Sequence, residues 1–347
     1  MPSIDVVIPN YQYGRYLPGC VASILAQGIP DTRILIIDNA STDNSVEVAQ
    51  EIARQDARVE LVARSTNLGP HASFNEGLDW ARARYFSVMC ADDLAMPQAY
   101  ARAIALMESH PGVGLAYGRA LRVIGDEPPA ASAQGSPGSR WRIQPGRAAI
   151  EAFCRQGFLP MVCCSTIVRT ETHKRAGYYR PSLPHSDDFE LWLRVACLAD
   201  VASTEAVQGA LRIHPQALSR FTYDHCLWDF SMYEGLFQAF FAQEGGRLES
   251  GERLYRLARR GVSSRAYWSG LARACRGEWS DALTLLRYAV HHHPSMAVLP
   301  PLPYLFRREG TTHRIRWSIR RAAETVRRAV VNENHPVADQ AVPAIRR

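Results

Sequence analysis

The sequence predicts an α/β domain followed by an all-helical C-terminal region. From Ile4 to Tyr117, short apolar runs that end in polar or turn residues alternate with helical patterns. Such alternation is typical of a mostly parallel sheet with crossover helices packed on it. Beyond His225 the pattern is helical only. With 347 residues and 47% hydrophobic content, the chain can bury a complete α/β core and still carry a smaller second unit.

The predicted elements of the first half place polar residues at one edge of the sheet. The strands expected are Ile4–Pro9, Arg33–Asp38, Val59–Ala63, Tyr85–Cys90 and Val113–Tyr117. The helices expected between them are Leu17–Gln27, Ser45–Gln55, Ala72–Arg82 and Pro97–His110. Ligands of open α/β sheets bind at the carboxyl ends of the strands. Asn10, Asp38, Asn67 and Asp92 all fall at these ends, so they are the first candidates for a binding site.

The middle of the chain is predicted to form a loop, and the remaining elements of the α/β domain follow it. The segment from Ile124 to Gly146 is rich in Gly, Pro, Ser and Ala, which is typical of a flexible loop. The elements expected after it are a helix near Arg147–Arg155, a strand near Ser165–Arg169, a helix Asp187–Cys197 and a loop through Leu211–Phe221.

The whole sequence predicts three regions. Residues 1–222 would form the α/β domain, residues 223–298 a helical region, and residues 299–347 a basic, partly helical tail. Ala266–Pro294 has the pattern of one tetratricopeptide-like helix pair, with Gly277 in its turn and Pro294 at its end. Its aromatic side chains, Trp268, Trp279 and Tyr288, are expected in the core of the pair. A single repeat cannot bury both faces, so it should pack on the α/β domain or on a partner.

The charge of the chain is local. Residues 300–347 hold ten arginines and four acidic residues, so the tail alone accounts for the net charge of +6. A basic tail suits an anionic membrane surface, and no basic face with interleaved aromatic residues supports nucleic acid as an alternative. No stretch reaches the roughly 20 apolar residues of a membrane-spanning helix. We therefore expect a cytoplasmic protein with peripheral contact to the inner face of the membrane.

Composition also excludes several classes of site. Lys174 is the only lysine, which excludes a Walker-type phosphate loop and leaves little scope for Schiff-base chemistry. The eight cysteines lack paired Cys-x-x-Cys spacing, so reduced thiols are expected. Cys163 and Cys164 lie in an apolar run without a partner at ligand spacing, and they are interpreted as structural.

Four motifs occur in a fixed order at the predicted strand ends. They are Pro9-Asn10-Tyr11, Asp38-Asn39-Ala40-Ser41-Thr42-Asp43, Asn67-Leu68-Gly69 and Cys90-Ala91-Asp92-Asp93. In this order they resemble the motifs of the family 2 glycosyltransferases, which have the GT-A fold, a Rossmann-like, mostly parallel sheet flanked by helices. The resemblance covers about residues 3–220. It implies a nucleotide-sugar donor and, in the terms of that family, bacterial polysaccharide or cell-envelope biosynthesis.

The adjacent acids Asp92 and Asp93 suit a nucleotide diphosphate, because this polyanion needs Mg²⁺ or Mn²⁺ and such ions take carboxylate oxygens. By the resemblance, Asp93 would ligate the metal and Asp92 would face the ribose. Asp38 would bind the base or ribose, while Pro9 and Tyr11 would shape the nucleoside pocket. Taken alone, the two acids could form a turn before a helix. Their place at the end of the fourth strand favours the metal site.

Three positions differ between this chain and the usual pattern of the family. Cys90 stands where the family often has an acid, so the metal could rest on Asp93 with phosphate and water. Asn39 and Ala40 replace the commoner Asp and Gly, which bears on the preference for the base more than on the fold.

A second acidic segment opens a later amphipathic helix. His185-Ser186-Asp187-Asp188-Phe189-Glu190-Leu191-Trp192-Leu193-Arg194 is similar to the Glu-Asp-x-Asp/Glu-x-Trp-x-Arg pattern of the family. The resemblance places Asp188 at the position of the catalytic base, which would take the proton of an acceptor hydroxyl. Capping of the helix by its acids is the alternative role.

A third segment, Leu211 to Ser219, resembles the Arg-x-His-x-x-x-x-Ser segment of the family. Arg212 would meet the charge on the leaving diphosphate, and His214 would serve as a further metal ligand. Solvated loop residues are the alternative for both.

Together these patterns predict an inverting glycosyltransferase of the hexosyltransferase type. By the resemblance, it would move a sugar from a UDP-sugar, the donor suggested by the family alone, to a hydroxyl on a glycan, lipid-linked glycan or protein, with Mg²⁺ or Mn²⁺ and with Asp188 as base. A nucleotidyltransferase is one alternative, although Asn10 to Arg15 lacks the Gly-rich, basic loop that would hold a triphosphate. A non-catalytic nucleotide-sugar binding module is the other, and the intact Asp38, Asp93 and Asp188 argue against it.

Overall fold

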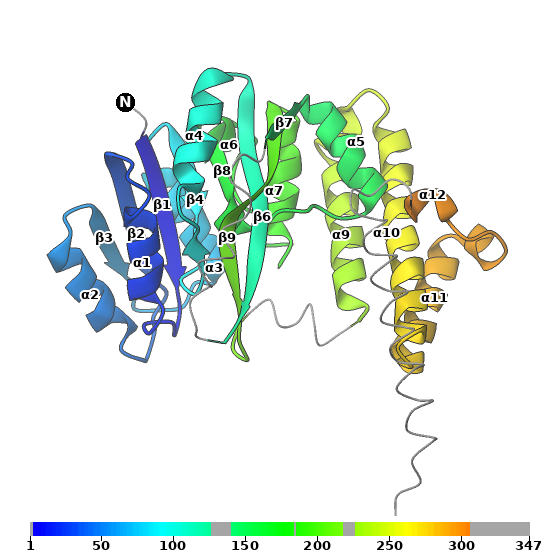
Figure 1. Cartoon of the computed structure of the whole chain (residues 1–347), viewed down its shortest axis with the longest axis horizontal. Helices are drawn as coiled ribbons and strands as arrows, with labels where there is room; N and C mark the ends of the chain where they lie inside the picture. Colours follow the sequence, from blue (N-terminus) through cyan, green and yellow to red (C-terminus); the bar gives the residue numbers. More distant parts are fainter. Residues whose placement is uncertain (1–2, 126–139, 184, 218–225, 306–347) are drawn as a thin grey trace, which may run out of the picture. The chain divides into compact units, whose positions relative to one another are not determined.

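The computed structural model describes residues 3–125, 140–183, 185–217 and 226–305. In these ranges the chain forms a nine-stranded mixed sheet with helices on both faces (Figure 1). The strands run in the order β3-β2-β1-β4-β8-β6-β9-β5, and β7 pairs with β9. The strand bounds are β1 Ser3–Asn10, β2 Asp31–Asp38, β3 Val59–Ala63, β4 Tyr85–Val88, β5 Leu94–Ala95, β6 Val113–Ile124, β7 Trp141–Gln144, β8 Thr166–Arg169 and β9 Asp200–Ile213.

The first four strands are parallel, as predicted, and the later ones are mostly antiparallel to their neighbours. One long parallel pair, β6 with β9, runs through the second half of the sheet. The helices of this region are α1 Leu17–Leu25, α2 Ser45–Gln55, α3 Pro70–Trp80, α4 Ala99–Ser109, α5 Gly146–Gln156, α6 Thr170–Ala176 and α7 Asp187–Ala196. α2 and β3 have the bounds that the sequence predicts. The other helices and strands predicted in the first half differ from the observed ones mainly at their ends.

Alternation along β1 divides the core into two layers. Ile4, Val6 and Ile8 lie in one cluster with buried residues of α1, α2 and α4. Val7 lies in the other cluster with residues of α3, α6 and α7. Because successive side chains of a strand point to opposite faces, β1 is buried on both sides, as parallel strands in α/β domains are. The close contact of α3 with β1 requires Gly77, whose added Cβ would lie 2.5 Å from Val7 Cγ2.

Two sequence predictions need correction. Leu211 to Ile213 were expected in a loop, but they form the end of β9, which pairs in parallel with β6. Trp141–Gln144, inside the predicted loop 124–146, forms β7 along the other edge of β9. Both errors have one cause, since these strands are short on continuous apolar residues and their pairing partners lie far away in the sequence. The rest of that loop, residues 126–139, lies outside the described residues.

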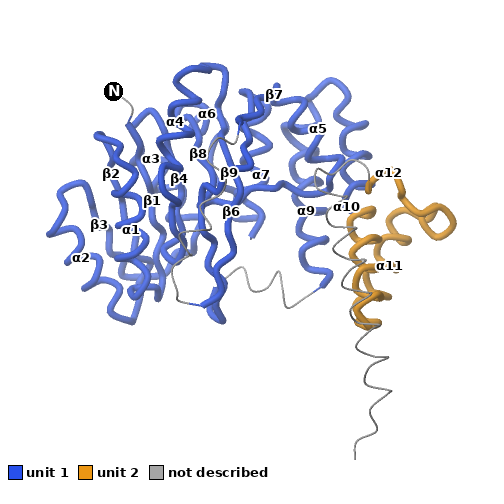
Figure 2. The backbone as a smooth tube through the Cα atoms, in the orientation of Figure 1, with its two compact units in different colours: residues 1–262 blue, residues 263–347 orange. Residues whose placement is uncertain are grey.

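The C-terminal helices are α9 Trp228–Ala242, α10 Gly251–Ala274, α11 Trp279–His292 and α12 Leu302–Leu305. The chain divides into two compact units, residues 1–262 and 263–347 (Figure 2). This division falls inside α10. The predicted boundary at 222–223 lies outside the described residues, as does most of the basic tail, from residue 306 on.

Within the second unit, a helix pair forms where the tetratricopeptide-like pattern predicts one. α11 approaches α10 closely at Gly270, where an added Cβ would lie 3.0 Å from Leu286 Cγ. The turn between them holds Gly277 at φ 80°, a backbone conformation that glycine adopts without strain. Trp279 was expected in the core of the pair and instead is 65% exposed.

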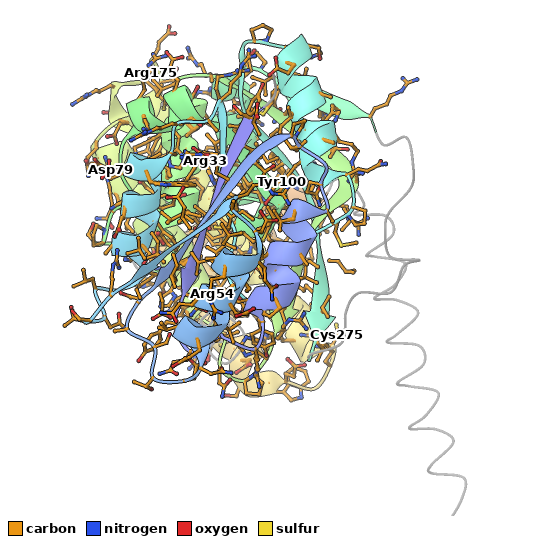
Figure 3. All side chains as sticks on the ribbon, turned by 90° about the vertical axis from the view of Figure 1, so that its left-hand side faces the viewer. Arg33, Arg54, Asp79, Tyr100, Arg175 and Cys275 are labelled. Carbon is orange, nitrogen blue, oxygen red and sulfur yellow. The ribbon has the colours of Figure 1, made fainter. Side chains whose placement is uncertain are left out.

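Side chains at the surface and in the interior of the α/β domain differ strongly in their exposure. Figure 3 looks onto the side at β3 and labels Arg54 on α2, whose side chain is 71% exposed, and Tyr100, which is 2% exposed. All eight cysteines are free thiols, as predicted. Among the helices of the described ranges, none is both long and apolar enough to cross a membrane.

Candidate active site

The register of the sheet brings the predicted strand-end residues together. Asn10 and Asp38 are direct neighbours at the ends of β1 and β2. Asp92 and Asp93 follow β4, on the other side of β1. After them the short β5 pairs with β9, so the end of β9 returns over the two acids with Arg212 and His214. Residues that are distant in sequence thus converge at one end of the sheet.

A cavity of about 960 Å³ opens at this end of the sheet. Six of the predicted candidates line it: Pro9, Asn10, Tyr11, Asn67, Asp92 and Asp93. Tyr11 lines the cavity and is 46% exposed as a residue, so its side chain can offer an aromatic surface to a planar ligand. Asp38, Asp188, Arg212 and His214 are not among the described residues that line the cavity. The volume is in the usual range for sites that bind small molecules and cofactors.

Asp38 holds the strand ends together rather than facing the cavity. Its carboxylate is fully buried and accepts hydrogen bonds from Asn10 Nδ2 at 2.7 Å and from the Ser41 backbone N–H at 2.9 Å. These bonds fix the loop after β2. Burial of a carboxylate is tolerated where several donors satisfy it, which is the case here.

Asn39, next in sequence, does line the cavity. Its Oδ1 accepts hydrogen bonds from Arg64 Nη1 at 3.1 Å and from the Leu68 backbone N–H at 2.9 Å. Its Nδ2 donates to Asn67 Oδ1 at 2.6 Å. The orientation of the amide is therefore fixed, and Asn39 together with Asn67 forms one wall of the cavity.

The acid pair is held by the end of β9. Asp93 is 2% exposed, and its Oδ1 accepts the backbone N–H of Arg212 at 3.0 Å. The Arg212 side chain donates from Nε to the carbonyl of Asp92 at 3.0 Å and from Nη1 to the carbonyl of Gly125 at 2.7 Å. Arg212 is thus a buried strand residue that fixes the turn, and it is not the solvated loop residue of the alternative interpretation.

His214 contacts the other acid. Its Nε2 lies 3.1 Å from Asp92 Oδ2, and its Nδ1 accepts the backbone N–H of Gln216 at 3.3 Å. Since Nδ1 accepts, the proton belongs on Nε2, which donates it to Asp92. The ring packs edge-on against Tyr13, with centroids 5.3 Å apart. In this arrangement His214 positions Asp92.

Cys90 joins the two acids in a cluster of metal-binding type. One ligand atom from each of Cys90, Asp92 and Asp93 lies within 4.8 Å of the others. Burial and the nearby Asp92 carboxylate hold the pKa of Asp93 well above its usual range. A divalent cation would compensate the charge of two adjacent carboxylates in such a place. The donor set of two carboxylates and one thiol therefore fits a cation such as Mg²⁺ or Mn²⁺, with the sulfur favouring the softer of the two.

Asp188 lies in the first turn of α7, where the helix dipole favours a negative charge. Its Oδ1 accepts the backbone N–H of Phe189 at 2.8 Å, and its Oδ2 accepts a hydrogen bond from the Cys163 thiol at 3.3 Å. Burial and the neighbouring Asp187 raise the pKa of Asp188 to about 7. A carboxyl group with this pKa can exchange a proton near neutral pH, as a general base requires.

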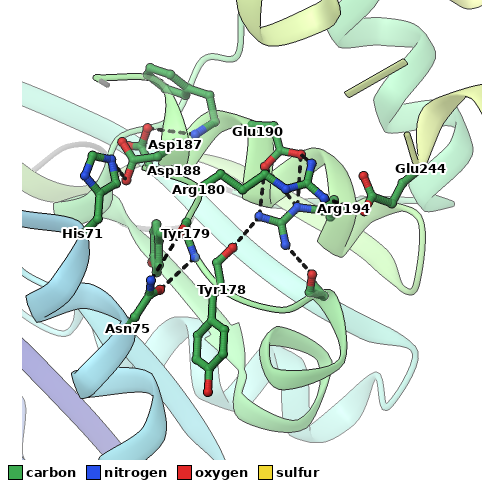
Figure 4. Close-up of polar contacts among 12 residues, drawn as sticks. His71, Asn75, Tyr178, Tyr179, Arg180, Asp187, Asp188, Glu190, Arg194 and Glu244 are labelled. Atoms are coloured by element: carbon green, nitrogen blue, oxygen red, sulfur yellow. Dashed lines mark hydrogen bonds and ion pairs between the residues drawn. The ribbon is translucent and has the colours of Figure 1, made fainter. Parts of the chain in front are cut away.

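A buried ion-pair network anchors α7 (Figure 4). Glu190, which is fully buried, forms ion pairs with Arg194 on the same helix and with Arg180 before it. Arg180 also pairs with Glu244, after α9. Arg194 Nη2 donates to the carbonyl of Tyr178 at 2.8 Å, which ties the preceding loop to the helix. The Glu and Arg of the sequence pattern thus fix the helix that carries Asp188.

Sequence reasoning missed three residues of this region. The motifs give Asn39 a bearing on the base preference but no place in the cavity wall, they give Cys163 a structural role, and they do not include His71. The contacts of Cys163 with Asp188 and of His71 with Asp187 join segments far apart in the chain. No local pattern signals such contacts. For Asn39, its place between two singled-out motif residues was the one available signal.

Known proteins similar to this chain are glycosyltransferases. Residues 5–173 match the family model described as glycosyl transferase family 2. An uncharacterized glycosyltransferase of Haemophilus influenzae is 25% identical over 232 residues, which are 65% of this chain and 69% of that protein. The glycosyltransferase GlyG of Streptococcus pneumoniae is 35% identical over 91 residues, which are 26% of this chain and 30% of that protein.

Solved structures extend the similarity in fold along the chain. S. aureus TarS 1–349, solved in complex with UDP-GlcNAc, has a TM-score of 0.59 at 14% identity, covering 94% of this chain and 92% of that chain. The mannosyltransferase PcManGT from Pyrobaculum calidifontis, solved with GDP-Man and Mn²⁺, has a TM-score of 0.56 at 15% identity, covering 95% and 87%. The chain is therefore a glycosyltransferase with the GT-A fold, and residues 5–173, just under half of it, match glycosyl transferase family 2.

Proposed function

We propose that this glycosyltransferase is inverting and transfers a hexose-type sugar from a UDP-sugar to a hydroxyl group on a glycan, a lipid-linked glycan or a protein. The observation that carries the proposal is the acid pair Asp92–Asp93, fixed by Arg212 and His214 at the wall of a ligand-sized cavity. A carboxyl group that can act as a base, Asp188, lies at the start of α7.

The donor nucleotide would bind in the cavity at the ends of β1 and β2. Tyr11 offers an exposed aromatic face for the base, and Pro9 and Asn67 line the same cavity. Asp38 was predicted to contact the base or ribose. Because its carboxylate is fully buried on Asn10 and Ser41, its contribution is to hold the strand ends that shape this pocket. Asp92 lines the cavity and contacts His214, and its proposed role is to face the ribose of the donor.

Asp93 is the proposed metal ligand, with the Cys90 thiol and Asp92 close enough to contribute. The cation, Mg²⁺ or Mn²⁺, would neutralise charge on the diphosphate when it is bound. His214 can join the ligands only if its Nε2 leaves Asp92, which it contacts at 3.1 Å. Arg212 would support the leaving group indirectly, because its side chain holds the carbonyl groups of Asp92 and Gly125.

Asp188 is the proposed base. Its carboxylate takes the proton of the acceptor hydroxyl while that oxygen bonds to the anomeric carbon and the bond to the diphosphate breaks. A single displacement of this kind inverts the anomeric configuration. The helix start and the Cys163 hydrogen bond fix where the carboxylate points.

The nucleotide of the donor is open to a direct biochemical test. TarS was solved with UDP-GlcNAc and PcManGT with GDP-Man, so the shared fold accommodates both nucleotides. A hydrolysis screen decides this, in which UDP-, dTDP- and GDP-sugars are incubated with Mg²⁺, Mn²⁺ or EDTA and the released nucleotide is quantified. We expect metal-dependent release of UDP from one sugar. Release from GDP- or dTDP-sugars alone would overturn the UDP assignment, and no release with any donor would count against transfer from nucleotide sugars.

The basic tail supports a proposal for where the protein acts in the cell. We propose peripheral contact with anionic lipid at the inner face of a bacterial membrane, during assembly of a cell-envelope polysaccharide. The support is the charge of residues 300–347, which equals the excess of the whole chain. Flotation with liposomes that contain phosphatidylglycerol should recover the full chain and not a variant that ends at residue 306. Equal recovery of both would contradict the role of the tail.

A further inference from the structure

Two carboxylates stand side by side at the start of α7, and only Asp188 has a proposed role so far. Asp187 is 5% exposed. Its Oδ2 lies 3.5 Å from Nε2 of His71, in the first turn of α3 (Figure 4). The side chains of His71 and Asp187 are 15% and 8% exposed. The contact therefore joins two helices that are far apart in the chain at a place with little access to water.

The two facing atoms have no other hydrogen-bond partner among the described residues. His71 Nε2 and Asp187 Oδ2 are both buried and otherwise unsatisfied. A buried carboxylate is stable as an anion only where a cation or several donors compensate it. His71 can supply the positive charge and the N–H donor that Asp187 needs. Pairing with Asp187 raises the pKa of His71 above its usual value.

The elements that carry the pair are themselves fixed. Asn75, one turn further along α3, exchanges two hydrogen bonds with the backbone of Tyr179, at 3.1 and 2.8 Å. The loop with Tyr178 is tied to α7 through Arg194. The start of α3 and the start of α7 are therefore held at a set spacing, which a loose surface contact would lack.

The other titratable groups near the two acids carry no positive charge that could replace His71. They are His185 before α7, Cys163, Cys90, Tyr179 and Tyr233 on α9. Burial lowers the pKa of His185 and raises the pKa of each of the thiols and phenols, so these groups are neutral near neutral pH. Among these neighbours, His71 is the cation that can compensate Asp187.

We propose that His71 is a positioning residue which, as imidazolium, pairs with Asp187 and leaves Asp188 as the one carboxylate that accepts the acceptor proton. This inference rests on the proposed role of Asp188. In the transfer step the proton moves from the acceptor hydroxyl to Asp188, the new bond forms at the anomeric carbon, and the diphosphate leaves. His71 keeps its proton throughout. It acts by partly compensating the charge of Asp187, because without this cation the neighbouring carboxylate would raise the pKa of Asp188 further.

The kinetic test compares His71→Gln with His71→Lys. Glutamine can still donate a hydrogen bond to Asp187 but carries no charge, and lysine restores the charge. In His71→Gln, the acidic limb of the profile of kcat against pH should move up by about one unit, the size of effect expected for one nearby charge. The KM for the donor should remain as in wild type. His71→Lys should bring the limb back. An unmoved limb in His71→Gln, or an equal shift in both variants, would overturn the proposal.

A second test needs no turnover. The imidazole signals of the full chain are followed by NMR between pH 5 and 9, and His71 is identified by the signal that is missing in His71→Gln. In Asp187→Asn, the titration midpoint of His71 should fall relative to wild type. An unchanged midpoint would contradict the pairing. Failure of the donor screen would instead refute the proposed function, so the two failures can be told apart.

Discussion

The thiol of Cys163 lies 3.3 Å from Oδ2 of Asp188 and donates a hydrogen bond to it. Cys163 comes from the short 3₁₀ turn before β8, whereas Asp188 opens α7. A hydrogen bond to the charged form of a carboxylate favours that form. The thiol therefore works against burial and Asp187, which together raise the pKa of Asp188 to about 7.

From this relationship we predict the pH profile of transfer. Asp188 acts as a base only when deprotonated, so kcat should fall about tenfold per pH unit below roughly pH 7 and level off above it. In Cys163→Ala, loss of the hydrogen bond should move the acidic limb to higher pH. The matched control is Cys275→Ala, at an exposed cysteine. Profiles measured between pH 5.5 and 9 check this, and a limb in Cys163→Ala that is unmoved or lies at lower pH would contradict it.

Removal of the metal should show in stability. A ligand that binds only the folded state, present at about 100 times its dissociation constant, stabilises that state by about 2.7 kcal/mol, on the order of 5 °C in Tm. Mn²⁺ at such a concentration should therefore raise the Tm by this amount. The shift should disappear on adding EDTA and in Asp93→Asn, because the proposed ligand is lost. Asp31→Asn, at an exposed carboxylate, should keep it. Differential scanning fluorimetry is the measurement, and a full shift in Asp93→Asn would exclude Asp93 as ligand.

Ala40 offers a test on stability alone. Its φ is 64°, in the left-handed region that residues with a Cβ disfavour. It stands at a position where the family more often has glycine. Ala40→Gly should therefore raise the free energy of unfolding by about 0.5–1 kcal/mol, the strain relieved less the entropy that glycine adds to the unfolded chain. Urea unfolding measures it. The control Ala26→Gly, at φ −68°, should lower stability instead, and equal effects of the two changes would disprove the assignment of strain.

Tyr11 should matter for the nucleotide in particular. Stacking of a base on an aromatic ring contributes about 1–3 kcal/mol, so Tyr11→Ala should weaken nucleotide binding by roughly fivefold or more. Tyr178→Ala is the control, because Tyr178 is similarly exposed, at 53% against 46%, and is not among the residues that line the cavity. Calorimetry with UDP and Mn²⁺ gives both affinities. Equal loss in the two variants would place the base elsewhere.

The sequence predicted the first half of the fold well because its signals are local. Apolar runs such as Ile4–Pro9 are buried on both faces, and α2 has a clear helical period, so element and type follow from neighbouring residues. β9 and β7 were missed since a strand in a mixed sheet is decided by its partners. For Leu211 to Ile213, those partners are Arg122 to Ile124 on β6, about 90 positions earlier.

The candidate site divides in the same way. The order of motifs anticipated that Pro9, Tyr11, Asn67, Asp92 and Asp93 would meet, and the cavity brings them together. It could not anticipate that the Asp38 side chain turns inward while Asn39 faces the cavity, because that depends on the donors around each side chain. Nor could it anticipate that His214 contacts Asp92, which follows from the return of β9 over the acid pair.

The most direct test of the account is Asp188→Asn, assayed for transfer and for donor binding in parallel. Asparagine keeps the shape and the place in α7 but cannot take a proton, so kcat should fall by about 10²–10⁴-fold. The dissociation constant for UDP with Mn²⁺ should stay as in wild type, because Asp188 is not among the described residues that line the donor cavity. That pairing of lost transfer with retained binding is the predicted result. A variant that keeps most of its turnover would contradict the assignment of Asp188 as the base.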